Sequence, residues 1–201
     1  MCKVSESDET LSEILANNFK AAFEAVSGHA YLVRTQAEVC DLILKIAQEA
    51  GAKRVALAEL PDSVMDEAET KCTAKGMEVL RPPYQTDTAL GEIDQVQVGV
   101  TGARFGIAET GTLAEVVFDD TSRLVSALPR THIGIVHARD LVETLRGSAA
   151  RMTELYAENP ENIMVSYISG PSRTGDIEMI LTLGVHGPEH AHAILILGDD
   201  A

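Results

Sequence analysis

Tryptophan is absent from this 201-residue chain, and all aromatic residues together make up only 4% of it. Hydrophobic residues still account for 45% of the sequence, so the core must consist mainly of valine, isoleucine, leucine and alanine. Those residues suit a buried sheet of largely parallel strands. A chain of this length can remove roughly 70% of its unfolded surface from water, so we expect one ordinary domain.

Basic residues are also scarce. Lys and Arg number 16 against 31 Asp and Glu, which gives a formal net charge of −15. That charge would repel both a nucleic-acid backbone and an anionic membrane surface. No apolar run approaches the roughly 20 residues of a membrane-spanning helix, and the polar, acidic first ten residues do not have the pattern of a secretory signal. We therefore expect a cytoplasmic protein with no nucleic-acid partner and no membrane span.

Cysteine is rare and irregularly spaced. Cys2, Cys40 and Cys72 form no C-x-x-C pair, so neither a disulfide framework nor a zinc or iron–sulfur site is indicated. The sequence also lacks the G-x-S-x-G, Walker A and G-x-G-x-x-G patterns. We expect reduced thiols and no cofactor bound by the chain itself.

Hydrophobic periodicity predicts two amphipathic helices, at residues 10–28 and 35–51, each opened by a T-x-x-E capping box. From residue 30 onward, candidate strands alternate with helices, which is typical of a mainly parallel sheet flanked by helices in an α/β fold. The predicted domain spans 1–201, with 1–28 as an N-terminal helical extension of an α/β core at 29–201. The candidate strands are 30–34, 54–60, 77–80, 96–103, 112–118, 132–136, 163–169 and 191–197, and the further helices are 61–76, 122–128 and 139–158.

The segment GIAETGT, residues 106–112, places a carboxylate beside hydroxyls and a glycine. Glu109 could serve as a nucleophile, a base or a positioning group for a ligand that approaches the backbone at Gly111. The same residues could instead form a β-bulge or a tight turn with an exposed glutamate. Both interpretations stay open at this stage.

The segment SGPSRTGDIE, residues 169–178, follows a predicted strand, where ligands commonly bind in α/β folds. Its arginine, Arg173, is suited to bidentate recognition of a carboxylate or phosphate, and its hydroxyls could donate hydrogen bonds. It could instead be a turn into a following helix capped by Thr174 or Asp176. Arg123, beside the short helix at 122–128, could also reach a bound anion. The predicted ligand-binding residues are Thr110, Gly111, Thr112, Arg123, Gly170, Ser172, Arg173, Thr174, Asp176 and Glu178.

Histidines gather near the end of the chain. His190 and His192 would face the same side of a strand, as two metal ligands can. No cysteine is near, and a structural zinc needs four ligands, so we assign no metal site. His186, within GVHGP at 184–188, is better interpreted as a loop histidine that hydrogen-bonds or titrates within a site. Glu109 and His186 are therefore the predicted catalytic residues.

Three ordered motifs resemble the LUD domain family of the lactate-utilisation protein C type. They are AETGTL at 108–113, RLVSALPRTHIGIV at 123–136, and GPSRTGDIE with LGVHGP between 170 and 188. The resemblance implies a fold like that of ribose-5-phosphate isomerase, glucosamine-6-phosphate deaminase and the CoA transferases. It also implies a role in oxidising lactate to pyruvate beside partner subunits that carry the iron–sulfur clusters, with a small anion bound around 108–112 and 170–176.

The resemblance leaves the chemistry of this chain open, because one fold hosts many reactions. Glu109-Thr110-Gly111 resembles the Glu-x-Gly setting of the nucleophile in CoA transferases. A stand-alone CoA or acyl transferase, or a sugar-phosphate enzyme, is therefore the alternative. A third possibility is an interaction module that docks on cluster-bearing partners through its acidic surface and first helix.

Overall fold

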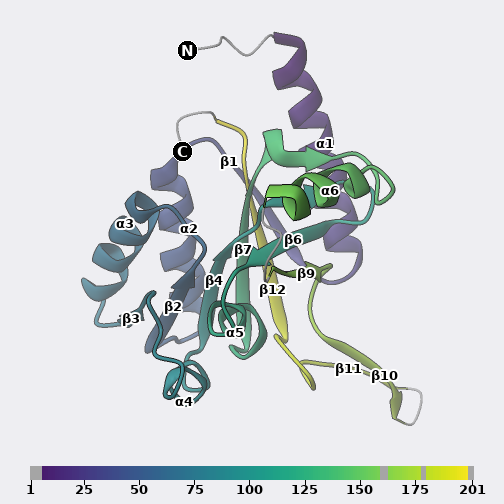
Figure 1. Cartoon of the computed structure of the whole chain (residues 1–201). Coiled ribbons are helices and arrows are strands. Elements are labelled where there is room, and N and C mark those ends of the chain that lie inside the picture. The colour runs from purple at the N-terminus through teal and green to yellow at the C-terminus, as the bar shows by residue number, and fades with distance from the viewer. Residues whose placement is uncertain (1–5, 159–162, 178–179, 199–201) are drawn as a thin grey trace.

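The computed structural model describes residues 6–158, 163–177 and 180–198. A six-stranded sheet lies at its centre, with every pair of neighbouring strands parallel (Figure 1). The predicted mainly parallel sheet flanked by helices is thus confirmed. In spatial order its strands are β1 (His29–Val33), β12 (His190–Ile196), β7 (Thr131–His137), β4 (Val98–Gly102), β2 (Arg54–Ala58) and β3 (Glu78–Leu80).

One face of this sheet carries large branched side chains. Leu57, Val100, Ile133 and Ile194 are wholly buried there. They pack in one cluster with buried residues of α2 (Gln36–Glu49) and α3 (Asp62–Thr73). Because side chains of a strand alternate between faces, the same strands present a different set of residues to the other side.

Small residues dominate that other face. Gly99 lies so close to the carbonyl of Val125 in α5 (Ser122–Ala127) that a side chain there would overlap it. Gly134 approaches Leu113 of β6 (Thr112–Val117) in the same way. The short helix and a second layer of strands can therefore pack directly on the parallel sheet, together with α4 (Ala89–Ile93).

The second layer is a four-stranded sheet in the order β8 (Leu141–Val142), β5 (Phe105–Ile107), β6, β9 (Met164–Ile168). β6 is antiparallel to both of its neighbours. Leu155 of α6 (Ser148–Glu158) packs on the outer side of this sheet. A further hairpin, β10 (Arg173–Ile177) and β11 (Ile180–Leu183), extends away from the body (Figure 1).

The first helix, α1 (Glu6–Ala25), packs on the small-residue side with its C-terminal half. Phe19 and Phe23 are fully buried in a cluster that includes Leu113 and Leu195. Leu11 is 55% exposed, and the N-terminal half of α1 extends past the rest of the molecule (Figure 1). The predicted start at the Thr10 capping box is wrong, because the helix already includes Glu6.

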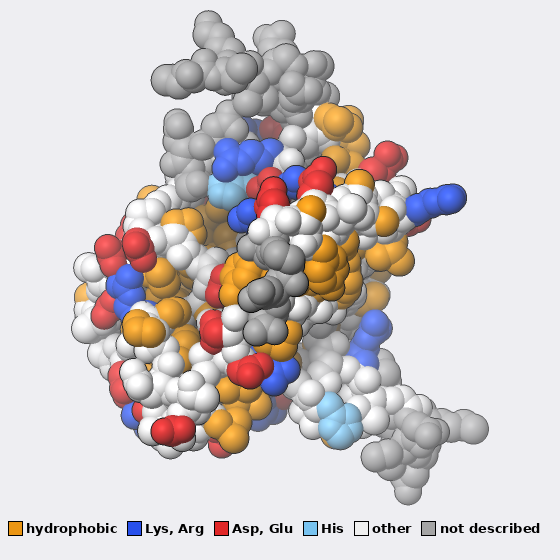
Figure 2. All heavy atoms as spheres, viewed as in Figure 1, with side chains coloured by type: hydrophobic (Ala, Val, Ile, Leu, Met, Phe, Trp, Pro, Cys, Tyr) orange, Lys and Arg blue, Asp and Glu red, His pale blue; other side chains and the backbone are white. Residues whose placement is uncertain are grey.

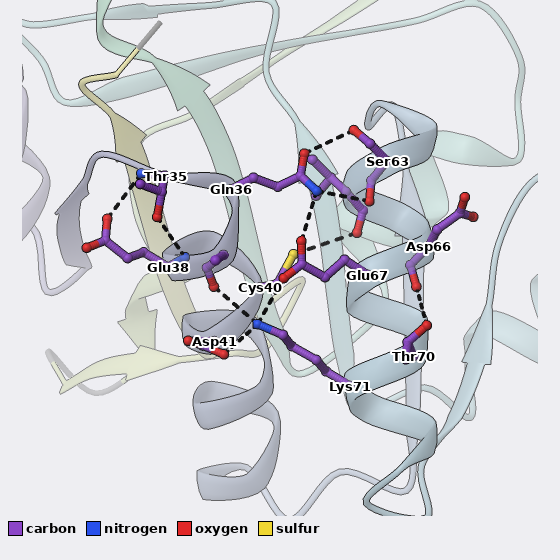
Figure 3. Close-up of polar contacts among 12 residues, drawn as sticks. Thr35, Gln36, Glu38, Cys40, Asp41, Ser63, Asp66, Glu67, Thr70 and Lys71 are labelled. Carbon is purple, nitrogen blue, oxygen red and sulfur yellow. Dashed lines mark hydrogen bonds and ion pairs between the residues drawn. The ribbon is translucent and has the colours of Figure 1, made fainter. Parts of the chain in front are cut away.

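The capping box predicted at residue 35 is confirmed (Figure 3). The backbone N–H of Glu38 donates to Thr35 Oγ1 at 3.3 Å, and the backbone N–H of Thr35 donates to Glu38 Oε2 at 3.1 Å. These bonds satisfy two N–H groups that the first turn of α2 would otherwise leave unpaired. On α3, the Lys71 ammonium lies 2.6 Å from Asp41 Oδ1 and 3.0 Å from Glu67 Oε1, which ties the two helices together.

Two segments in the second half differ from the helices that the sequence suggested. One helix begins later than predicted, and the other does not form. Residues 138–147 form a 3₁₀ turn at Ala138–Asp140, then β8 and a loop, so the helix begins only at Ser148. Pairing of Leu141 with Gly106 of β5 overrides the local helical pattern. The segment after Ser172 forms the hairpin instead of a helix. None of the helices that the structure describes is long and apolar enough to cross a membrane.

Candidate functional site

Hydroxyl groups join the two sequence motifs. Thr112 opens β6 and Ser169 follows β9, and these strands are paired in the second sheet. Thr112 Oγ1 lies 2.7 Å from Ser169 Oγ and 2.6 Å from Thr110 Oγ1. Loops that are distant in the sequence therefore meet through a continuous row of three hydroxyls.

The glycines of both motifs fit against the end of α1. Gly111 has a φ of +58°, and a side chain there would overlap the backbone of Phe23. Gly170 has a φ of +110°, and a Cβ there would lie 2.9 Å from Val26 Cγ2. Their lack of a side chain is therefore needed for packing, whatever ligand the loops hold.

Glu109 supports a neighbouring loop. It is exposed, and its Oε2 accepts a hydrogen bond of 2.9 Å from the backbone N–H of Leu145. Its own N–H donates to the carbonyl of Glu143 at 3.0 Å. The carboxylate thus holds the segment that leads into α6, and its predicted catalytic role stays a prediction.

The second motif lines a cavity of about 260 Å³, which we call the motif pocket. Two loops build it and are tied together: the Ser172 N–H donates to the Pro188 carbonyl at 2.8 Å, and the Gly184 N–H donates to the Ser172 carbonyl at 3.0 Å. The predicted residues in its wall are Gly170, Ser172 and His186. Ser166 and Ser169 add further hydroxyls.

The other predicted ligand residues lie elsewhere. Arg173 and Thr174 begin the hairpin, opposite Leu183 and Thr182 of β11, and Arg173 is exposed. Asp176 lies in β10, and Glu178 falls outside the described residues. Arg123, on α5, is exposed and lies 3.8 Å from Asp120 Oδ1. No lysine or arginine that the structure describes lines the motif pocket, so of the predicted side chains the geometry brings together Ser172 and His186 but not the arginines.

A row of buried polar residues, the buried polar chain, lies behind the motif pocket. Ser126 of α5 donates to Glu115 Oε2 of β6 at 2.6 Å, and Thr101 Oγ1 of β4 lies 2.8 Å from His132 Nε2 of β7. Glu115 is only 1% exposed, and its Oε1 has no hydrogen-bond partner among the described residues. Ser126 and His132 also line the motif pocket and form its floor, whereas Glu115 and Thr101 do not line it.

Burial shifts the pKa values of the two ionisable groups in the buried polar chain, Glu115 and His132. Loss of water raises the pKa of Glu115, although the hydroxyls of Ser126 and Thr101 oppose that effect. Burial lowers the pKa of His132 to about 4, with a smaller contribution from His192. In each case the uncharged form is favoured, because an ion would lose its hydration. The pocket floor is therefore polar, and its His132 is uncharged at neutral pH.

The sequence interpretation missed these four residues. Glu115 stands inside a run that was interpreted simply as a buried strand, and all six residues of β6 are buried. A glutamate within such a run is the signal that could have identified it, because a buried carboxylate requires hydrogen-bonding partners. Which residues supply those partners depends on how α5, β4 and β7 pack around β6.

The histidines at the chain end do not form a metal cluster. His190 is exposed, and the His192 ring stacks on His29 with centroids 5.1 Å apart. Burial, aided by nearby His29 and His190, lowers the pKa of His192 to about 4. Within the described part of the chain, no group of three or more His, Cys, Asp or Glu side chains is arranged to hold a metal.

A family comparison defines the class to which this α/β domain belongs. The LUD domain model matches residues 16–196, which include all six strands of the parallel sheet and the motif pocket. The chain belongs to the LUD domain family.

Individual relatives are similar over part of their length. Lactate utilization protein C of Bacillus subtilis is 34% identical over 125 residues, which cover 57% of this chain and 50% of that protein. Lactate utilization protein C of Halalkalibacterium halodurans is 36% identical over 105 residues, covering 51% and 45%. The chain spans about half the length of the curated relatives it matches. The crystal structure of a DUF162 family protein from Deinococcus radiodurans superposes with a TM-score of 0.64 at 25% identity, covering 92% of this chain and 98% of that one.

Proposed function

We propose that this chain is a component of a lactate-utilisation system and binds a small carboxylate in the motif pocket. In this role it supports oxidation of lactate to pyruvate beside partner proteins that carry iron–sulfur clusters. Family membership and the names of its relatives support the first part. The observation that carries the second is the convergence of Ser169, Ser172 and His186 on one cavity.

The chemistry of the pocket suits a small hydroxy or keto acid. Its volume of about 260 Å³ lies just below the range of sites for drug-sized ligands. Ser169, Ser172 and His186 can donate hydrogen bonds to a carboxylate. Ser126 and the neutral His132 in the pocket floor add no negative charge that would repel a carboxylate.

Calorimetric titration with L-lactate, D-lactate and pyruvate tests the ligand. We expect binding to the wild type and at least tenfold weaker binding to His186→Ala and Ser172→Ala. His190→Ala is the matched control, because His190 is exposed and does not line the pocket. Equal affinities for the His186 and His190 variants would refute the proposed binding mode.

Purification from native cells tests the place of the chain in a larger system. We expect cluster-containing subunits to accompany it, and the assembly to reduce an electron acceptor when lactate is added. Recovery of the chain without other subunits, together with full catalytic activity in a reaction that does not involve lactate, would contradict the proposal.

The alternative, an acyl or CoA transferase that uses Glu109, stays a prediction that the pocket geometry does not favour. Glu109 does not line the motif pocket, and its carboxylate accepts a hydrogen bond from Leu145. The decisive measurement is hydroxylamine or borohydride trapping after incubation with an acyl-CoA. A modified peptide containing Glu109 would establish the transferase, and an unmodified one would exclude this nucleophile.

A further inference from the structure

A second cavity lies where the parallel sheet reverses its order. The chain runs from β2 outward to β3, but from β4 its next parallel strand is β7 on the opposite side. β2 and β4 are neighbours, so their carboxyl ends flank the reversal, where open α/β sheets commonly bind ligands. A cavity of about 430 Å³ occupies this position, and we call it the carboxyl-edge pocket. It is lined at the ends of four strands by Glu59, Gly102, His137 and Ile196.

The backbone at this reversal is constrained. Glu59 follows β2 directly and has a φ of +54°, a left-handed conformation that non-glycine residues seldom adopt. Gly102 ends β4 beside it, and any side chain there would overlap the Glu59 carbonyl. Close contact between the two loops therefore holds Glu59 in a costly conformation. Such conformations concentrate at binding sites, where they aim a side chain at a ligand.

The lining combines apolar side chains with one arginine, Arg104, and the carboxylates of Glu59, Asp140 and Glu158. Leu60, Val64 and Ile135 supply apolar walls, and Phe118 stands at the surface with 53% of its area exposed. Figure 2 shows hydrophobic side chains beside charged ones on the face that carries β6 and β9. An aromatic ring that borders a cavity and remains half exposed can cover the apolar part of a bound molecule.

Arg104 is the arginine that lines this pocket. It makes no ion pair with any residue that the structure describes, whereas the nearby Asp140 lies 3.4 Å from Arg151. Its backbone is held by a 2.8 Å hydrogen bond from its N–H to the Ala114 carbonyl. In a chain with a net charge of −15, an unpaired arginine facing a cavity is suited to an anion, and its planar guanidinium matches a carboxylate.

Glu59 provides the complementary group. Its side chain is exposed at the pocket. Loss of some of the water around its carboxyl, together with the nearby Asp119 carboxylate, raises its pKa, while the Ser122 hydroxyl opposes the shift. A hydroxyl or amino group of a ligand could donate a hydrogen bond to this carboxylate.

We propose that the carboxyl-edge pocket is a second ligand site, which binds an organic carboxylate with an aromatic or branched apolar body. Arg104 pairs with the carboxylate, Phe118 and the apolar walls enclose the body, and Glu59 accepts a hydrogen bond from a hydroxyl or amino group. The volume exceeds what a three-carbon acid fills and falls within the range of pockets for larger organic molecules. This site is independent of the motif pocket and of the function proposed for it.

Calorimetric titration with three probes tests this site. The probes are 3-phenyllactate, which has every required group, 3-phenylpropane-1,2-diol, which lacks the carboxylate, and lactate, which lacks the apolar body. We expect 3-phenyllactate to bind wild type. The diol should bind wild type at least tenfold more weakly than 3-phenyllactate does, and 3-phenyllactate should bind Arg104→Gln and Phe118→Ala at least tenfold more weakly than it binds wild type. Both residues are exposed, so the substitutions should leave unfolding temperatures close to that of wild type.

Arg146→Gln is the matched control, because Arg146 is exposed in the loop before α6 and makes no ion pair among the described residues. It should bind 3-phenyllactate as wild type does. Equal affinity for the acid and the diol, or an unchanged affinity in Arg104→Gln, would overturn the proposal, as would no binding of 3-phenyllactate at all. Lactate binding that survives in Arg104→Gln but not in His186→Ala would show that the two pockets act separately.

Discussion

At the scale of single residues, His132 is a titratable group almost without contact with water. Only 1% of its surface is exposed, and Thr101 Oγ1 lies 2.8 Å from its Nε2. Its pKa of about 4 in the folded protein compares with about 6.5 in an unfolded chain. The folded state thus binds fewer protons than the unfolded state between these two values, and folding becomes less favourable as the pH falls through them.

The free energy of unfolding should therefore decrease between pH 6.5 and pH 4, with His132 contributing a loss of about 3 kcal/mol by the lower limit. Urea unfolding of His132→Gln, which cannot take up the proton, should show a shallower decrease over the same range. His190→Gln is the control, because its exposed side chain should leave the wild-type dependence intact. Parallel curves for wild type and His132→Gln would show that His132 does not titrate in this way.

Gly111 offers a second prediction at this scale, because its φ of +58° and its contact with Phe23 act together. Gly111→Ala should destabilise the protein by more than about 2 kcal/mol, since it adds a steric overlap to the backbone cost. Gly76 also has a positive φ, +81°, but nothing lies within 4 Å of a Cβ placed there. Gly76→Ala should therefore show the backbone cost alone, about 1 kcal/mol. Equal losses in denaturant titrations would mean that α1 moves aside.

At the scale of elements, α1 is anchored by its C-terminal half. Phe19 and Phe23 stack with centroids 5.7 Å apart, and both are fully buried. The two motif glycines, Gly111 and Gly170, contact the end of the same helix. The helix therefore supports the loops that build the motif pocket, in addition to any surface it offers to a partner.

Phe19→Ala should lower the free energy of unfolding by about 3–5 kcal/mol, because it leaves a cavity between α1 and the sheet. Leu11→Ala, on the exposed half of the same helix, should change it by no more than about 0.5 kcal/mol. Guanidinium unfolding of both variants provides the comparison. Similar small losses in both would show that α1 is dispensable for the fold.

For two segments of the chain, the local sequence pattern does not predict the element that forms. The helical pattern from residue 139 is interrupted because β8 pairs with β5, a partner more than thirty residues earlier in the chain. After Ser169 the turn residues were compatible with a following helix, and pairing between β10 and β11 makes this segment a hairpin instead. In contrast, α2 could be predicted with both ends, because its capping box and the positive φ of Gly51 are local.

At the scale of the whole molecule, the excess of acidic residues opposes folding. The net charge is −15, and on the face shown in Figure 2 acidic and basic side chains are interspersed. Most ion pairs involve exposed side chains, which stabilise little. Repulsion between the remaining carboxylates should therefore dominate the surface electrostatics.

Raising NaCl from about 20 to about 300 mM should accordingly raise the midpoint of thermal unfolding, because salt screens that repulsion. A neutral solute at equal osmolality controls for effects unrelated to charge. A lower midpoint in salt would show that the surface ion pairs contribute more than the repulsion removes.

The amino-acid sequence alone is enough to predict the parallel α/β architecture and the capped helix α2, because hydrophobic periodicity and caps act over a few neighbouring residues. It also pointed to Ser172 and His186, although not to the cavity that they share. The three-dimensional packing was needed to show which strands form a second, largely antiparallel sheet, and that Ser126, bonded to the buried Glu115, shares the wall of the motif pocket with His132. It alone also placed Glu59 and Arg104 at the reversal of strand order. Strand order and the approach of loops depend on contacts between distant segments, and no local pattern encodes them.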